Sequence, residues 1–196
     1  MLKVGITGGI GSGKSVVCQV FQTLDIPVFN ADHAAKYLME TDAILIEAIK
    51  KALGNNSYTG NTPNRDIIAS IVFQNPEKLQ QLNALVHPAV LAYGHQWMAA
   101  QHSPYVIKEA AIFFESGSYK EMDVMVGVSA PKAVRLQRAL QRGNITEQEV
   151  LQRMANQMGE DEKMKRCDYV ITNDGNTAIL PQIIELHQNL LKQATL

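Results

Sequence analysis

Short apolar runs and amphipathic segments alternate along the whole chain. Runs rich in β-branched and aromatic residues, which are typical of buried strands, occur at 2–7, 26–29, 105–111, 123–128 and 169–172. Apolar residues at helical spacing follow the first run and recur at 33–39, 43–53, 65–73, 77–86, 132–141, 147–158 and 178–191. Pro88 is expected to open a further helix, which carries Trp97, and the polar segment 54–64 is expected to be a loop.

Strands that alternate with helices at these lengths indicate a parallel sheet that helices cover on both faces. The pattern therefore predicts an α/β fold: a three-layer α/β/α domain with a mostly parallel sheet of five strands. The length of 196 residues fits one domain, 1–196, with room for small insertions.

The first predicted strand runs directly into the octapeptide Gly8-Gly9-Ile10-Gly11-Ser12-Gly13-Lys14-Ser15. This is a complete phosphate-binding loop, in which backbone N–H groups surround phosphate oxygens, Lys14 reaches the outer phosphates and the Ser15 hydroxyl binds Mg²⁺. Apolar residues follow the loop at helical spacing, so we expect the positive end of a helix to face the phosphates as well. These residues are Val16, Val17, Val20, Phe21 and Leu24. A dinucleotide-binding G-x-G-x-x-G does not fit, because Lys14 stands where its third glycine would be. No N-K-x-D tetrapeptide occurs, which disfavours regulatory GTPases.

Composition narrows the class of partner. A formal net charge of −1 argues against a nucleic-acid-binding surface, and small anionic substrates need only local cations. No apolar run approaches 18 residues, so we expect a cytoplasmic protein without a membrane partner. Cys18 and Cys167 have no metal-binding or redox spacing and are expected to be buried thiols.

In a parallel sheet, ligands gather at the carboxyl ends of the strands. That rule selects the phosphate loop after the first strand, Asp32 after the second, Glu115 after the 105–111 run and Asn173 after the last. Asp32 could position the hydroxyl that accepts a phosphoryl group, or it could be a helix cap, and one carboxylate can do both.

Three further residues keep both a functional and a plain interpretation. Arg65 could bind a substrate anion or be a solvated surface group, and His87 is more often a capping or packing residue than an acid or base. Glu115 could hold a Mg²⁺-bound water or a substrate hydroxyl, or stand at a helix start. Glu109, inside a predicted strand, would be costly to bury unpaired and could also face the metal.

Basic residues concentrate near the end of the chain. Residues 132–166 contain eight of the eighteen Lys and Arg residues, against five acids. Arg138 and Arg142 lie four apart on one predicted helix, and Arg153 lies on the next, beyond Gly143-Asn144. Two helices that meet at a Gly-Asn hinge could form a closing lid, at about 138–160, or an ordinary charged hairpin. Asn173 begins an Asn-Asp-Gly turn that could also contact a nucleotide base.

The ordered set of motifs resembles the dephospho-CoA kinase family over nearly the whole chain. Its elements are the phosphate loop, Asn30-Ala31-Asp32, Arg65 before an Ile-rich helix, Leu85-Val86-His87-Pro88, Phe114-Glu115-Ser116-Gly117, 138–142 with 153–157, and 168–173. Two positions depart from the usual pattern. Ala111 stands where the family usually has a proline, and Cys167 precedes Asp168 where the family usually has an alanine.

The resemblance implies ATP-dependent phosphorylation of the ribose 3′-hydroxyl of dephospho-CoA, with Mg²⁺ as cofactor. It implies catalytic roles for Asp32 and Lys14, a Mg²⁺ ligand in Ser15 and an acceptor side formed by Asp32, Arg65, His87 and Glu115, together with a helical acceptor-binding insertion at about 33–100. It places ATP on Gly9, Gly11, Ser12, Gly13, Lys14, Ser15, Val16, Arg138, Arg142 and Asn173. The alternatives are a kinase for another small hydroxylated acceptor and a nucleotide-switched binding module.

Overall fold

A computed structural model of the chain describes residues 1–143 and 146–195. Contacts within the chain divide it into two compact units, one made of residues 1–30 and 101–196 and the other of residues 31–100. We describe each unit by itself. The predicted insertion at about 33–100 falls within the second unit.

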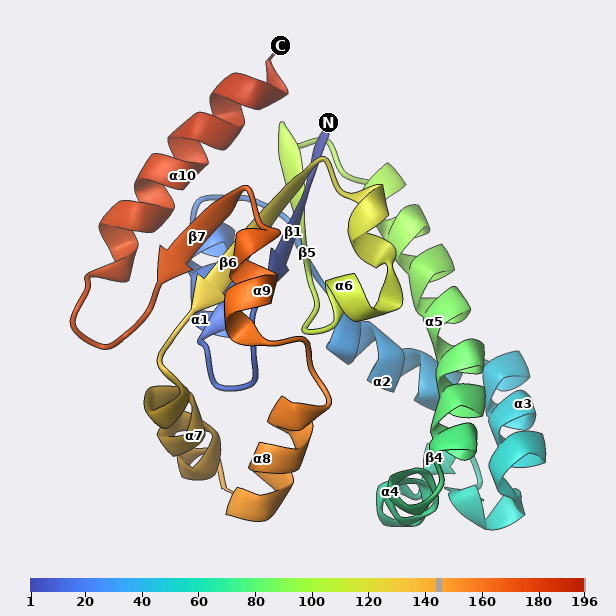
Figure 1. Cartoon of the computed structure of the whole chain (residues 1–196). Helices are drawn as coiled ribbons and strands as arrows, with labels where there is room; N and C mark the ends of the chain where they lie inside the picture. The colour runs from blue at the N-terminus through green and yellow to red at the C-terminus, as the bar shows by residue number, and fades with distance from the viewer. Residues whose placement is uncertain (144–145, 196) are drawn as a thin grey trace. The chain divides into compact units, whose positions relative to one another are not determined.

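The first unit is built on a parallel sheet of five strands (Figure 1). Its strands, in spatial order, are β2 (Val28–Asn30), β5 (Tyr105–Glu109), β1 (Leu2–Thr7), β6 (Val124–Ser129) and β7 (Tyr169–Thr172). All four neighbouring pairs are parallel, and β1 lies in the centre with Ile6 opposite Glu109 and Val126. The predicted α/β class and the five parallel strands are therefore confirmed.

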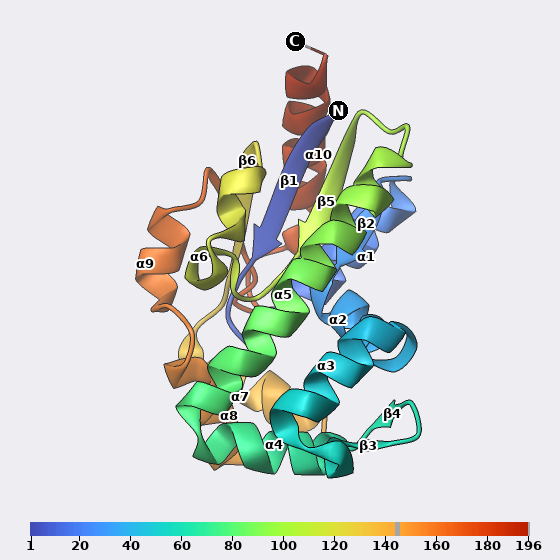
Figure 2. The ribbon, with the colours of Figure 1, turned by 90° about the vertical axis from the view of Figure 1, so that its right-hand side faces the viewer.

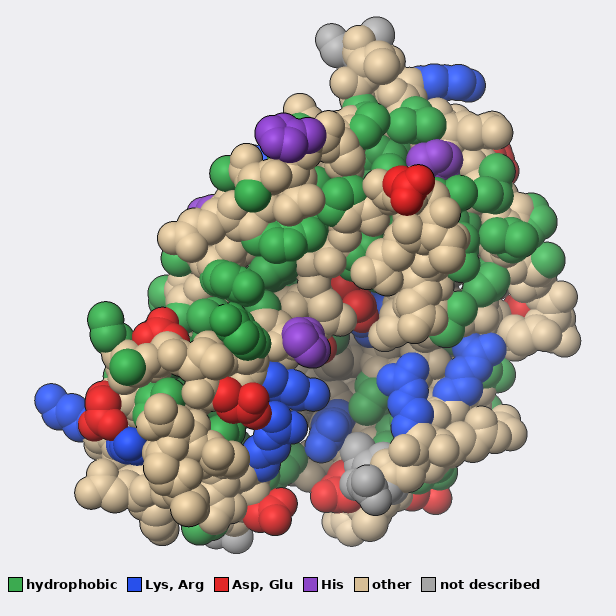
Figure 3. Space-filling view, turned by 180° about the vertical axis from the view of Figure 1, so that it is seen from behind, with side chains coloured by type: hydrophobic (Ala, Val, Ile, Leu, Met, Phe, Trp, Pro, Cys, Tyr) green, Lys and Arg blue, Asp and Glu red, His purple; other side chains and the backbone are tan. Residues whose placement is uncertain are grey.

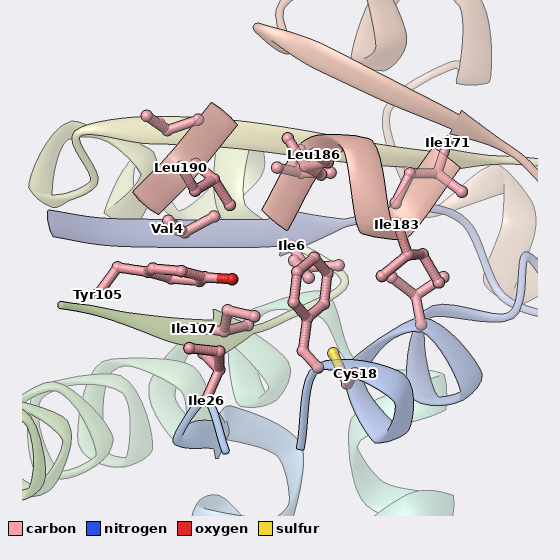
Figure 4. Close-up of a cluster of buried hydrophobic side chains, with 14 of the residues drawn as sticks. Val4, Ile6, Cys18, Ile26, Tyr105, Ile107, Ile171, Ile183, Leu186 and Leu190 are labelled. Carbon is pink, nitrogen blue, oxygen red and sulfur yellow. The ribbon is translucent and has the colours of Figure 1, made fainter. Parts of the chain in front are cut away.

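The core of this unit lies between the sheet and two helices, α1 (Lys14–Thr23) and α10 (Ile179–Ala194). Strand residues such as Ile6 and Ile107 face Cys18 of α1 and Ile183 of α10, and all four are fully or almost fully buried (Figure 4). Side chains alternate between the faces of a strand, so every second residue of β1 and β5 enters this layer. Removal of these apolar groups from water is the main contribution to the stability of the unit.

The opposite face of the sheet is covered by short helices. They are α6 (Phe113–Ser116), the 3₁₀ turn η2 (Ser118–Glu121) and α9 (Glu160–Lys165). Lys108 of β5 points to this side, 3.7 Å from Glu121, and a Cβ added to Gly127 would lie 2.5 Å from the Met164 sulfur. The predicted three-layer arrangement is confirmed for this unit. The helices α7 (Lys132–Gln141) and α8 (Glu147–Ala155) follow β6. The predicted helix 147–158 ends at Ala155, and it is followed by α9, a separate short helix that was not predicted.

The second unit is helical with a small hairpin (Figure 2). It contains α2 (Ala31–Thr41), α3 (Ala43–Leu53), η1 (Asn55–Ser57), the two-residue strands β3 (Tyr58–Thr59) and β4 (Thr62–Pro63), α4 (Arg65–Gln74) and α5 (Pro76–Ala99). The segment predicted to be a plain loop is thus an antiparallel hairpin with a glycine, Gly60, at its turn. Tyr58 is buried and donates a 2.9 Å hydrogen bond to the Met39 carbonyl, which ties the hairpin to α2.

The prediction that Pro88 opens a helix is wrong, because α5 runs unbroken from Pro76 to Ala99. Its start is set by Asn75, whose side chain accepts hydrogen bonds from the backbone N–H groups of Glu77 and Lys78. Proline inside a helix removes one hydrogen bond. Here Val86, Val90 and Met98 continue a buried face on both sides of it, so tertiary packing outweighs that loss.

The two thiols are free cysteines. Cys18 is buried, and burial raises the pKa of its thiol far above the usual range. Cys167 is half-buried and its sulfur contacts the Lys163 carbonyl at 3.3 Å; burial is the main cause that raises its pKa to about 11. The expectation of buried, unpaired thiols is confirmed for Cys18 and holds in part for Cys167. Among residues 1–143 and 146–195, no helix is long and apolar enough to cross a membrane.

The packing of α10 predicts the effect of two identical substitutions. Leu186 is 4 % exposed within the core, and Leu180 on the same helix is 54 % exposed. We expect Leu186→Ala to lower the free energy of unfolding by about 2 to 5 kcal/mol, through lost burial and a cavity, and Leu180→Ala to change it by less than about 1 kcal/mol. Urea denaturation of the two variants measures the difference. Equal losses would show that the α10 interface is not the core described here.

Candidate active site

The phosphate loop connects the end of β1 to the first turn of α1. Gly11 and Gly13 have φ angles of 78° and 95°, in the left-handed region that glycine adopts without strain. The Lys14 ammonium donates hydrogen bonds to the carbonyls of Gly8 at 2.7 Å and Gly9 at 3.3 Å, so its side chain lies across the loop. The predicted strand, loop and helix order is present.

The glycines of the loop are also required by packing from outside. A Cβ at Gly9 would overlap the Arg135 guanidinium, and one at Gly11 would overlap the Arg135 carbonyl. A Cβ at Gly13 would overlap the side-chain nitrogen of Asn173. The glycines of the motif therefore serve phosphate binding and also leave room for Arg135 of α7 and for Asn173 at the end of β7.

Asn173 and Arg138 are brought together against this loop. The Asn173 side-chain nitrogen donates to the Ser12 carbonyl at 2.8 Å, and the Arg138 guanidinium donates to the Asn173 carbonyl at 2.9 Å. The backbone N–H of Asn173 donates to Ser129 at 2.8 Å, which anchors it to the end of β6. Two of the residues expected on the ATP side thus lie beside the phosphate loop.

Arg135 was not identified as a site residue from the sequence. It is buried, its Nε donates to the Ala130 carbonyl at 3.0 Å, and it pairs with Glu160 at 3.4 Å. Gln157 was also missed as an individual contact, and its side-chain oxygen accepts a 3.2 Å hydrogen bond from the Ile10 N–H of the loop. The only local signal for Arg135 was its place in the basic segment 132–166, because its contact with Gly9 depends on tertiary structure.

Arg142 and Val16 lie at positions open to solvent. Arg142 caps the C-terminal end of α7, and Val16 is 45 % exposed near the start of α1. Figure 3 shows a group of Lys and Arg side chains in the lower right of the view from behind, the part of the molecule that contains α7 in Figure 1. Of the expected Gly143-Asn144 hinge, Gly143 has a φ of 73° and Asn144 lies outside the described residues. Thr146 caps α8 through a capping box with Glu149.

Glu109 is buried at the end of β5, next to the phosphate loop. One of its oxygens accepts a 2.6 Å hydrogen bond from the Asn30 side chain, and the other contacts the Ser15 hydroxyl at 3.5 Å. A carboxylate and a hydroxyl are oxygen ligands of the kind that Mg²⁺ prefers, directly or through water. The donor set at this position therefore fits a magnesium ion.

Glu115 has different partners. Its Oε1 accepts hydrogen bonds from the Met158 N–H at 2.7 Å and from the Lys163 ammonium at 3.1 Å. Burial by itself raises the pKa of this carboxyl, but the Met158 N–H and the Lys163 ammonium outweigh that effect and the pKa is lowered. Ala111, which replaces the family proline, offers its carbonyl to Lys163 at 2.8 Å. The backbone path before Glu115 is thus fixed by Lys163.

The remaining expected site residues belong to the second unit. Asp32 lies in the first turn of α2, which begins at Ala31, so a carboxylate there interacts favourably with the helix dipole without being the cap residue itself. Arg65, the first residue of α4, is largely exposed and pairs with Glu40 at 2.9 Å. His87 lies inside α5 instead of between two helices, and burial lowers the pKa of its imidazole.

These features define a P-loop kinase fold, and solved structures agree. A Thermus thermophilus protein has a TM-score of 0.85 and 31% identity, over 98% of this chain and 97% of that one. Dephospho-CoA kinase from Campylobacter jejuni has a TM-score of 0.71 at 24% identity, over 97% and 98% of the two chains, which supports the fold alone.

Sequence comparison assigns the family. The sequence model of the family described as dephospho-CoA kinase matches residues 2–178. Relatives named dephospho-CoA kinase include one from Chlorobium chlorochromatii, 40% identical over 100% of this chain and 96% of its own. Another, from Bacteroides fragilis, is 36% identical over 94% of this chain and 91% of its own. The chain belongs to the dephospho-CoA kinase family, and the resemblance inferred from its motifs is confirmed.

The contact between Gly13 and Asn173 predicts a sharp difference between two glycines. Gly117→Ala provides the control, since Gly117 has a φ of 76° and nothing within 4 Å of an added Cβ. Both alanines carry the strain of the left-handed region, roughly 1 to 2 kcal/mol, but only Gly13→Ala also pushes Asn173 off the loop. We expect Gly13→Ala to weaken ATP binding at least about tenfold and Gly117→Ala to change it less than about twofold, as measured by calorimetry. Similar ATP affinities in the two variants would contradict this packing.

Proposed function

We propose that the protein transfers the γ-phosphate of ATP to the ribose 3′-hydroxyl of dephospho-CoA, giving coenzyme A and ADP, the last step of coenzyme A biosynthesis. The observation that carries the proposal is a complete phosphate loop, joined by Asn173 to the end of β7, in a chain that belongs to the dephospho-CoA kinase family over residues 2–178. The substrates are small molecules, and we place the reaction in the cytoplasm.

On the donor side, we assign ATP to the loop from Gly9 to Val16. Backbone N–H groups of Gly11, Ser12 and Gly13 would surround the β-phosphate at the positive end of α1. The Lys14 ammonium would release its hydrogen bonds to the Gly8 and Gly9 carbonyls and donate to phosphate oxygens instead. Arg138, Arg142 and Asn173 would contact the nucleotide from the C-terminal side. The helices of the segment 138–160 would act as a lid that supplies positive charge and excludes water.

The residues around Ser15 would hold the metal. When bound there, Mg²⁺ would supply positive charge that offsets the negative charge developing on the phosphates during transfer. We assign Ser15 as its protein ligand and Glu109 as the buried carboxylate that orients a water of the ion, since Glu109 lies 3.5 Å from the Ser15 hydroxyl. The alternative carboxylate, Glu115, is engaged by Met158 and Lys163.

On the acceptor side, Asp32 would accept or orient the proton of the 3′-hydroxyl as it attacks the γ-phosphate. Chain connectivity supports this role: Asp32 lies two residues beyond Asn30, which contacts Glu109, and two residues span at most about 7 Å. Arg65 would bind an anionic group of the acceptor, and this contact would replace its exposed ion pair with Glu40. His87, with its lowered pKa, would be neutral at pH 7 and act as a hydrogen-bonding group.

Incubation with Mg-ATP and a panel of acceptors tests the proposal. We expect ADP release that depends on dephospho-CoA and is much slower with adenosine, AMP or gluconate. Preference for another acceptor would favour a kinase of different specificity. ATP binding without acceptor-dependent ADP would favour a nucleotide-switched binding module.

The role of Asp32 predicts the kinetics of Asp32→Asn. We expect turnover to fall by about 10² or more while ATP affinity stays within about twofold, because the carboxylate acts on the acceptor hydroxyl. Asp42→Asn is the matched control: Asp42 caps α3 through the N–H groups of Ile44 and Leu45, and asparagine caps equally well. Steady-state assays with both substrates varied measure the effect. Near-normal turnover of Asp32→Asn would show that Asp32 has no catalytic role and only stabilises the start of α2.

The assignment of Glu109 predicts a change in the magnesium requirement. Glu109→Gln keeps an oxygen that can accept the Asn30 hydrogen bond but removes the charge beside Ser15. We expect the free Mg²⁺ concentration for half-maximal activity to rise about 10- to 100-fold, the usual effect of losing an outer-sphere partner of a metal. Glu185→Gln, on the exposed side of α10, is the control. If the two variants have the same magnesium dependence, Glu109 does not support the metal.

A further inference from the structure

The segment 157–163, which we call the strap, comprises part of the connection after α8 and the first residues of α9, and it touches the phosphate loop. On its loop side, the Gln157 side-chain oxygen accepts a 3.2 Å hydrogen bond from the Ile10 N–H. Glu160 pairs with Arg135 at 3.4 Å, and its Oε2 lies 3.0 Å from the position of a Cβ on Gly9. The strap therefore contacts the loop directly through Gln157, while Glu160 lies close to Gly9 and pairs with Arg135.

A single carboxylate oxygen holds the strap at both of its ends. Oε1 of Glu115 accepts from the Met158 N–H at 2.7 Å, one residue after Gln157, and from the Lys163 ammonium at 3.1 Å. Lys163 also donates to the Ala111 carbonyl at 2.8 Å. Glu115 and Ala111 follow β5, so these bonds fix the strap to the sheet.

The partners of Glu115 leave it little freedom to bind a substrate. The Lys163 side chain is fully buried, and a buried ammonium that loses its counter-ion is strongly unfavourable. The Glu115 side chain is 23 % exposed, and burial around the pair strengthens the interaction relative to one in water. Its negative charge is therefore committed to Lys163 and to the N–H of Met158.

We infer that Glu115 is a positioning residue of the ATP side: by fixing Met158 and Lys163, it holds Gln157 on the Ile10 N–H and so keeps the phosphate loop in its binding shape. This differs from the acceptor-side role that the family resemblance implies for Glu115. The inference rests on the proposed function for the identity of the donor, ATP. It assigns no contact between Glu115 and either substrate.

The test separates the two substrates. Binding of the non-hydrolysable β,γ-imido analogue of ATP with Mg²⁺, and of dephospho-CoA, is measured by calorimetry on Glu115→Gln. We expect the dissociation constant of the ATP analogue to rise about five- to tenfold and that of dephospho-CoA to change less than about twofold. The reverse pattern, or an unchanged affinity for the ATP analogue, overturns the inference.

Two further variants keep the test decisive. Glu162→Gln is the matched control inside the strap, because Glu162 is exposed and pairs with the exposed Arg166 at the end of the same helix, so it should change neither affinity. Glu115→Asp keeps the charge that Lys163 needs but shortens the side chain, so it should fold and still weaken binding of the ATP analogue at least about threefold. If Glu115→Gln does not fold, a wild-type affinity in Glu115→Asp overturns the inference.

A double-mutant cycle with Gln157→Ala identifies the route. If Glu115 acts through Gln157, Gln157→Ala alone weakens binding of the ATP analogue, and adding Glu115→Gln weakens it further by less than about twofold. If the fold-changes of the two single variants in the dissociation constant of the ATP analogue multiply in the double variant, the two residues act independently. That result would overturn the inference that Glu115 acts through Gln157. The arm with the ATP analogue needs no acceptor, so a protein that fails to bind dephospho-CoA would contradict the proposed function without deciding the role of Glu115.

Discussion

The hydrogen bond from the Asn173 side chain to the Ser12 carbonyl, at 2.8 Å, is the contact on which the rest of the site depends. A phosphate loop is a glycine-rich segment with little side-chain packing of its own, so its shape must be imposed by its neighbours. Asn173 closes it from the end of β7, Arg135 lies under Gly9 and Gly11, and Gln157 holds the Ile10 N–H. Segments far apart along the chain therefore stabilise one conformation of the loop.

The two glutamates near the carboxyl end of β5 have different partners and different roles in this account. Glu109 is buried beside Ser15 and Asn30, at the position that we propose for the magnesium ion. Glu115, six residues later, is bound to Met158 and Lys163 and anchors the strap. Sequence patterns alone could not separate them, because both are single carboxylates near the same strand end. Their partners, which lie elsewhere in the chain, distinguish them.

Much of the fold could be predicted from local patterns, and the exceptions have physical reasons. The five strands and the phosphate loop were anticipated, because short apolar runs rich in β-branched and aromatic residues and the glycine motif are local signals. Pro88 was misleading, since packing of Val86 and Val90 carries α5 through it, and the hairpin at 58–63 and the short helix α9 have almost no periodicity to detect. Arg135 and Gln157 were missed as site contacts because their role depends on long-range contacts.

The most direct test of this account is the position of the new phosphate on the product. After incubation of the protein with Mg-ATP and dephospho-CoA, the product is isolated and its ribose protons and phosphorus are examined by NMR. The account predicts a single new phosphomonoester whose phosphorus couples to the ribose H3′. A phosphate on another hydroxyl, or ATP consumed without a phosphorylated acceptor, would contradict it.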